Sequence, residues 1–158
     1  MKDLLTLLQR DSTLSLEELS KQTGMSTGEI EEKRQKYEAD GVICGYQALV
    51  DWGKCGKITA LIEVRITPQD SGGFDRIAQR ISRYEQVESV YLMSSGNYDL
   101  SVIISGSTLQ EVAEFVSSHL ALIKGVTGTS THFILKKYKE HHSCFALPET
   151  EEREPFVL

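Results

Sequence analysis

Apolar residues near the start of the chain fall into three short groups, with the three- and four-residue spacing of one helix face. The groups predict helices over residues 2–10, 16–23 and 27–40. Glycine and small polar residues separate the groups, which indicates tight turns between the helices. We therefore expect a compact three-helix unit. It would pack on the apolar residues of the first helix, which are Leu4, Leu5, Leu7 and Leu8.

The second and third predicted helices share a start signal of the form Ser-x-x-Glu, beginning at Ser15 and at Ser26. In such a capping box the serine hydroxyl accepts from an amide one turn on, and the glutamate reaches back to the serine amide. Gly24 lies between the two helices, and Gly41 follows the third, where helices commonly end on a residue with positive φ. This arrangement predicts a helix-turn-helix unit, and such units place their second helix in the major groove of DNA.

A β-rich, largely apolar run over residues 42–50 follows the third helix and predicts a strand. With it, residues 1–50 would form a winged helix-turn-helix domain. Residues 51–56 contain two glycines and are the expected hinge to a second domain.

Strand and helix patterns alternate in the second half of the chain. Their order is strand, helix, strand, strand, helix, strand, which is the βαββαβ order of a ferredoxin-like plait. The predicted fold class is therefore α+β, with the plait over residues 57–139. The expected strands cover residues 57–67, 87–95, 98–105 and 126–138, and the second and third are joined in a hairpin at Gly96-Asn97. The first expected helix buries Phe74, Ile77, Ala78, Ile81 and Tyr84. The second is capped by a box at Thr108 and buries Leu109, Val112, Val116 and Leu120.

The predicted plait carries helices on one face of its sheet, so its other face needs a cover. We expect that face to be rich in Val, Ile and Leu, and two such faces can cover one another. A homodimer is the expected result.

The predicted third helix is acidic, which matters because most affinity for DNA comes from neutralised phosphates. Residues 26–40 hold three basic and five acidic side chains, and residues 1–50 hold six basic and nine acidic ones. Lys33, Arg34 and Lys36 nevertheless lie close together. Two interpretations stay open: one basic face of the helix binds DNA, or the unit is a module that binds another protein.

Composition indicates an ordinary globular protein of 158 residues with a net charge of −6. No run approaches the roughly eighteen apolar residues of a membrane span, and Met1 leads straight into the first helix. We expect a cytoplasmic protein without a membrane partner. Cys44, Cys55 and Cys144 are widely spaced, which favours reduced structural thiols.

No pattern typical of a metal, cofactor or catalytic site stands out. His119, His132, His141 and His142 do not share ligand spacing with cysteines or carboxylates, so solvated or capping roles are expected. No Ser-His-Asp or Cys-His arrangement is supported by the local sequence. We therefore expect no enzyme activity, no cofactor and no metal.

Residues 140–158 form an acidic tail with flanking prolines and a few apolar residues. An arm that clips onto a neighbouring subunit and a disordered end are both compatible with this composition.

Six segments of the chain resemble the Lrp/AsnC regulators, also called feast/famine regulatory proteins. The similarity runs in order from the start to about residue 139, without large insertions. The helix-turn-helix, the G-V-I-x-G-Y run and the G-x-x-D hairpin each lie where that family has them. The segments are LLTLLQRD at 4–11, SLEEL at 15–19, GMS at 24–26, EADGVICGY at 38–46, SGNYDL at 95–100 and TSTHFILKK at 129–137.

The resemblance implies a transcription regulator that binds double-stranded DNA and responds to an amino acid or a related metabolite. In the family the plait is called the RAM domain; it dimerises through its sheet, often builds octamers, and binds its effector near the G-x-x-D hairpin. The sirohaem decarboxylases share this architecture, but their histidine and basic pattern is not matched here. The expected DNA-binding residues are Lys21, Ser26, Thr27, Lys33, Arg34 and Lys36, and the expected effector-binding residues are Gly96, Asn97, Tyr98, Asp99, Thr129 and Thr131.

Overall fold

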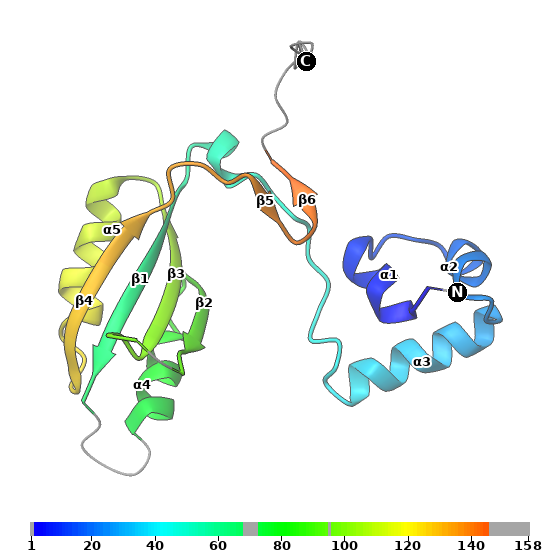
Figure 1. Cartoon of the computed structure of the whole chain (residues 1–158), viewed down its shortest axis with the longest axis horizontal. Coiled ribbons are helices and arrows are strands. Elements are labelled where there is room, and N and C mark those ends of the chain that lie inside the picture. Colours follow the sequence, from blue (N-terminus) through cyan, green and yellow to red (C-terminus); the bar gives the residue numbers. More distant parts are fainter. Residues whose placement is uncertain (1, 68–72, 95, 146–158) are drawn as a thin grey trace, which may run out of the picture. The chain divides into compact units, whose positions relative to one another are not determined.

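Figure 1 shows a computed structural model of the chain, which describes residues 2–67, 73–94 and 96–145. The chain divides into two compact units, one from the residues up to Val50 together with those from Tyr138 on, and one from Asp51 to Lys137. The prediction for the tail beyond residue 145 lies outside the described residues. The elements are α1 (Leu4–Arg10), α2 (Leu16–Thr23), α3 (Thr27–Ala39), η1 (Trp52–Cys55), β1 (Ile58–Ile66), α4 (Gly73–Ile81), β2 (Val87–Leu92), β3 (Leu100–Gly106), α5 (Leu109–Phe115), η2 (Val116–Leu120), β4 (Val126–Phe133), β5 (Lys139–Glu140) and β6 (Ser143–Cys144).

The first unit contains the three predicted helices, packed around a small leucine-rich core. Leu19 of α2 and Ile30 of α3 are both fully buried. The capping boxes at Ser15 and Ser26 both form, which confirms the predicted helix starts. Short helices such as these depend on burial of one apolar face for their stability. The core residues are Leu4, Leu7, Leu8, Leu19 and Ile30.

The strand predicted over residues 42–50 is wrong. α3 ends in a Schellman turn, in which Gly41 has a φ of 69° and the Val42 N–H donates to the Tyr37 carbonyl over 2.8 Å. Beyond this turn the chain is an uncoiled trace in Figure 1, and no described strand pairs with it. A β-rich sequence needs a hydrogen-bonding partner to become a strand, and the described part of this chain supplies none.

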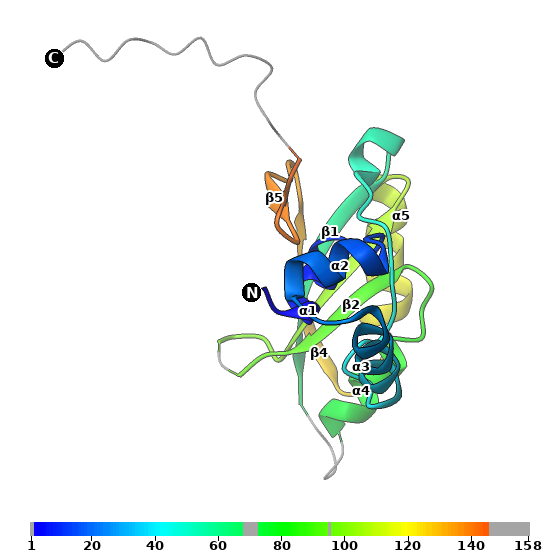
Figure 2. The same cartoon turned by 90° about the vertical axis from the view of Figure 1, so that its right-hand side faces the viewer.

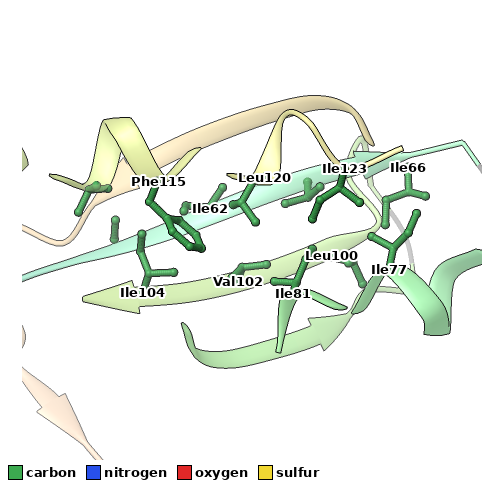
Figure 3. Close-up of a cluster of buried hydrophobic side chains, with 13 residues drawn as sticks. Ile62, Ile66, Ile77, Ile81, Leu100, Val102, Ile104, Phe115, Leu120 and Ile123 are labelled. Carbon is green, nitrogen blue, oxygen red and sulfur yellow. The ribbon is translucent and has the colours of Figure 1, made fainter. Parts of the chain in front are cut away.

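The second unit is the predicted plait. Its four strands lie in the order β2-β3-β1-β4, and every neighbouring pair is antiparallel, which confirms the βαββαβ fold. α4 and α5 cover one face of this sheet. Figure 3 shows Ile77 and Ile81 of α4, and Phe115 with Leu120 from α5 and η2, meeting strand side chains such as Ile62 in one buried layer.

Several predicted element details in the plait are wrong. β2 and β3 end at the Leu92–Leu100 pair and are joined by residues 93–99, not by a two-residue turn at Gly96-Asn97. Leu109 remains half exposed because it lies in the first turn of α5, ahead of the face that meets the sheet. Tyr84, predicted on the helix face, lies beyond the end of α4, and the last strand, predicted to reach residue 138, ends at Phe133. The capping box predicted at Thr108 is incomplete, because the Glu111 carboxylate accepts from the Ser107 N–H instead of the Thr108 N–H.

The uncovered face of the sheet is mixed, not rich in Val, Ile and Leu as predicted. Neighbouring residues of a strand point to opposite faces, and the helix-side core takes most branched residues of β1 and β3. The open face keeps Leu61 and Ile103 next to polar groups. On it the His132 ring bonds to the Glu63 carboxylate at 3.0 Å and to the Ser130 hydroxyl at 3.2 Å.

The residues after β4 contain a short hairpin of β5 and β6, where sequence had placed the start of an acidic tail. His141 and His142 form its two-residue turn, with φ values of 43° and 70°. Positive φ at both turn positions is the geometry of a type I′ hairpin. The three cysteines are free and exposed, as expected for reduced thiols. No helix among the described residues is long and apolar enough to cross a membrane.

Candidate functional site

The turn between α2 and α3 is held by side chains as well as by backbone. Gly24 has a φ of 76°, and its N–H donates to the Ser20 carbonyl over 2.8 Å. The Ser20 hydroxyl donates to the Met25 carbonyl at 2.6 Å, and the buried Thr23 hydroxyl donates to the Leu19 carbonyl at 2.7 Å. These bonds fix the direction in which α3 leaves the turn. The sequence signal for them is limited to the glycine.

Ser26 and Glu29 tie the first turn of α3 together. The Glu29 carboxylate accepts from the Ser26 hydroxyl at 2.7 Å and from the Ser26 N–H at 2.8 Å. Bonds from that hydroxyl, and then from that amide, hold the pKa of Glu29 below its ordinary value of 4.5, and the charge of Lys33 adds a smaller effect. Ser26 is therefore engaged within the helix start, whereas the neighbouring Thr27 is exposed at the leading end of α3.

The basic residues of α3 do not form one continuous strip. Lys33 and Lys36 are exposed and lie on one side of the helix, three residues apart. Arg34 is half buried on another side, with its guanidinium 5.6 Å from the ring centroid of Tyr46. Its buried Nε has no hydrogen-bond partner among the described residues. Among the predicted DNA-binding residues, the exposed cations are Lys33 and Lys36 of α3 and Lys21 of α2.

In the plait, whose strands β1, β2 and β4 are labelled in Figure 2, the described residues between β2 and β3 bond to one another and to the end of β1. The Met93 N–H donates to the Asp99 carbonyl at 2.8 Å, and the Asp99 N–H donates to the Val64 carbonyl at 2.9 Å. The Asp99 carboxylate accepts from the Ile66 N–H at 2.6 Å. Asp99, expected as an effector residue, is therefore also part of the sheet's bonding.

Arg65 of β1 contacts the same residues between β2 and β3. This contact was not predicted from the sequence. The Arg65 Nε donates to the Asn97 carbonyl at 2.7 Å, and the guanidinium lies 5.3 Å from the ring centroid of Tyr98. Gly96 precedes these residues with a φ of 118° and open space around it. The sequence signal for Arg65 is weak, because β1 also contains a second charged residue, Glu63. The structure thus brings together Asn97, Tyr98 and Asp99 around Arg65.

Thr129 and Thr131 do not join this group within one chain. They pair across β4 and β1 with Val64 and Ile62, and directly paired residues point to the same face of a sheet. Both threonines therefore lie on the helix-covered face, away from the exposed Arg65. A site that uses them together with the loop would need a second subunit.

The histidines belong neither to the exposed surface of α3 nor to the group of residues around Arg65. His119 is exposed and stacks on Tyr84 with 5.2 Å between ring centroids. Across the described residues, no group of three His, Cys, Asp or Glu side chains is placed to hold a metal ion.

The chain joins a helix-turn-helix unit, of the kind that transcriptional regulators use to read DNA, to a ferredoxin-like plait. The sequence pattern of the Lrp/AsnC ligand binding domain matches residues 59–144. The chain is 42% identical over 154 residues to an uncharacterized HTH-type transcriptional regulator, YugG, of Bacillus subtilis, a match that covers 96% of this chain and 92% of that protein.

Two solved structures have the same fold. An AsnC family transcriptional regulator from Agrobacterium tumefaciens matches with a TM-score of 0.71 and 29% identity, over 94% of this chain and 97% of that one. The transcriptional regulator NMB0573 of Neisseria meningitidis, in complex with L-Met, matches with a TM-score of 0.73 and 23% identity, over 92% of each chain. The chain belongs to the Lrp/AsnC family and is a transcriptional regulator of that type.

Proposed function

We propose that the protein binds duplex DNA through α3 and changes its binding when an amino acid or a related metabolite binds beside Gly96, Asn97, Tyr98 and Asp99. The observation that carries the DNA half is the braced turn, in which the Ser20 hydroxyl donates to the Met25 carbonyl and the Thr23 hydroxyl accepts from the Met25 N–H, so that α2 holds the residue that precedes the cap of α3. A recognition helix that is rigid before it binds loses less entropy on docking.

Lys33, Lys36 and Lys21 supply the phosphate contacts in this proposal, and Thr27 supplies a hydroxyl at the leading end that reaches base edges. Ser26 stabilises the start of α3 and does not offer a free hydroxyl to DNA, because that hydroxyl donates to the Glu29 carboxylate. Arg34 takes a supporting role against Tyr46. With few free cations and an acidic surface, binding should be weak at high salt.

A pull-down of fragmented genomic DNA at low salt, followed by sequencing, tests the DNA half. Wild type should enrich discrete fragments, including the region upstream of its own gene. Lys33→Glu should weaken binding to all enriched fragments alike, because a phosphate contact carries no sequence information. Lys124→Glu is the matched control, since Lys124 is an exposed lysine of the plait and its loss should change nothing.

Absence of any enriched fragment would contradict the DNA half and favour the second candidate, a protein-interaction module. The observation that favours this candidate is the acidic composition of α3, in which five acidic side chains accompany three basic ones over residues 26–40.

For the effector half, the loop offers the chemistry that an amino acid requires. Asp99 is a half-buried carboxylate able to accept from an ammonium group, Tyr98 is a half-buried ring, and the loop backbone is held in place by Arg65. The Neisseria regulator similar to this chain is described in complex with L-Met, which supports an amino acid as the ligand class. Thr129 and Thr131 would enter such a site only from an adjoining subunit.

We further propose that the open face of the sheet is covered by the same face of a second copy, giving a homodimer that can assemble further to an octamer. Leu61 and Ile103 supply apolar contact area on that face. The proposal places the protein in the cytoplasm and includes no catalytic step, cofactor or membrane.

A further inference from the structure

The outer side of α3 follows from its buried side. Ile30 is fully buried, and Tyr37, about two turns further on, packs against the same core. Figure 1 shows α1 and α2 on one side of α3. Successive residues of an α-helix are rotated by about 100° around its axis. The exposed residues that lie within about 40° of the direction opposite Ile30 are Gly28, Glu32, Gln35 and Ala39.

These four residues form the outer stripe of α3. A recognition helix turns its outer side towards the major groove, and residues near its start reach the base edges. Glu32 is the charged member of the stripe. Lys33 and Lys36 lie together to one side of it, where cations contact phosphates and do not read bases. The side chain at the centre of the proposed reading surface is therefore a carboxylate.

The glutamates of α3 differ in what they bond. The Glu29 carboxylate accepts from the Ser26 hydroxyl and amide, and the Glu38 carboxylate accepts from the Tyr46 hydroxyl at 2.8 Å. Both carboxylates are thus engaged within the unit. Glu32 is exposed, and its carboxylate bonds to no residue in the described part of the chain. Glu32 therefore keeps its acceptor capacity for a partner.

The chemistry of the base edges selects among partners for such a carboxylate, which can only accept hydrogen bonds. In the major groove cytosine presents its N4 amino donor, whereas guanine and thymine present acceptors that repel a carboxylate, and adenine presents a donor beside an acceptor. Cytosine is the best complement. Gln35 has a donor and an acceptor in its amide and excludes no base, so the selectivity of the stripe rests on Glu32.

The charge of Glu32 also explains how an acidic helix can serve recognition. The phosphates repel this charge, which lowers the affinity of α3 for every duplex. A cytosine in the right position recovers part of that loss, and the other bases do not. An interaction that penalises the wrong partner raises specificity even where it lowers affinity.

We propose that Glu32 is a specificity-determining residue, whose carboxylate accepts a hydrogen bond from the N4 amino group of a cytosine in the target site. The proposal rests on the proposed DNA function and adds a required base pair to it.

The test is the selection of binding sites, at low salt, from duplex DNA with a randomised central segment, by the full-length wild type and by Glu32→Gln. The variant keeps the shape of the side chain, but its amide can also donate to the other bases. One C·G pair of the wild-type motif should lose its preference in the variant, while the other positions stay the same. By fluorescence anisotropy, replacing that pair with T·A should weaken wild-type binding about 5- to 150-fold and leave the variant nearly unaffected.

Glu31→Gln is the matched control, because Glu31 is exposed on the same helix but lies to the side of the outer stripe. Both variants lose one negative charge, so both should bind every duplex more tightly than wild type. Only Glu32→Gln should change the base preference.

Three results would overturn the role of Glu32 while DNA binding stands: a motif unchanged in Glu32→Gln or absent in wild type, a changed position that is not a C·G pair, or the same change in Glu31→Gln. If wild type retains no duplex at low salt, the DNA function and the role of Glu32 are both overturned.

Discussion

At the scale of single residues, Asp99 belongs to the fold as well as to the proposed effector site. Its carboxylate closes the end of β1 by accepting the Ile66 N–H, beyond the Val64–Leu100 pair at which the pairing of β1 with β3 ends. A backbone amide past the end of a ladder lacks its strand partner, and a carboxylate is a strong substitute acceptor. Truncation of Asp99 therefore cannot be a pure ligand-binding test.

We predict that Asp99→Ala lowers the free energy of unfolding by about 1–3 kcal/mol, because the Ile66 amide loses its acceptor. Asp99→Asn should cost less, since its amide oxygen can still accept that bond while the negative charge is lost. Urea unfolding of both variants measures the difference. Equal stability of Asp99→Ala and wild type would show that the bond does not contribute to the fold.

Gly96 lets the loop take a φ of 118°, and an added Cβ would meet no other atom there. Gly96→Ala should therefore cost about 1–3 kcal/mol from backbone strain alone. Gly28 in α3 is the matched control, because it also has open space but no positive φ. Gly28→Ala should stabilise the protein by up to about 1 kcal/mol through helix propensity. Thermal unfolding of both variants checks the opposite signs.

At the scale of elements, the features that sequence predicts are those fixed by neighbours in the chain. The helix starts at Ser15 and Ser26 and the helix end at Gly41 are local, and all three form. The prediction of a strand over residues 42–50 is wrong because β-structure requires a second strand as hydrogen-bonding partner, which the sequence does not identify. The role of Arg65 could not be foreseen either, because it depends on a loop more than thirty residues away that folds back against β1.

The start of α3 should respond to pH through Glu29. Bonds from Ser26 lower the pKa of Glu29 in the folded protein, so the charged form favours the folded state. This stability is fully present above the ordinary value of 4.5 and is lost as the pH falls through the lowered pKa of the folded state. Unfolding free energies measured across this range should decline less in Glu29→Gln than in wild type. Parallel pH profiles for the two proteins would contradict the assignment.

At the scale of the whole molecule, the proposed homodimer depends on the open sheet face. The face carries Leu61, Ile103 and the ring of Tyr91 beside the His132–Glu63 pair, so it is less apolar than the covered face. Interfaces of this mixed kind are ordinary among protein complexes. Its polar groups restrict which surface can face them, and a second copy of the same face meets that condition.

We predict a dimer by light scattering at micromolar concentration. Ile103→Lys should shift the protein towards monomer without unfolding it, because Ile103 lies outside the buried core. Leu122→Lys is the control, since Leu122 is 74% exposed after η2 and its substitution should leave the dimer intact. A wild-type monomer, or an Ile103→Lys dimer as tight as wild type, would contradict pairing through this face.

The central claim is that one molecule couples an amino acid at the plait to DNA at α3. The direct measurement is fluorescence anisotropy of an enriched duplex, titrated with wild-type protein in the presence and absence of a saturating amino acid that binds it. We predict that the amino acid changes the dissociation constant by about 5- to 150-fold, and that Asp99→Asn binds the DNA but loses this response. The same dissociation constant with and without the bound amino acid would contradict the account.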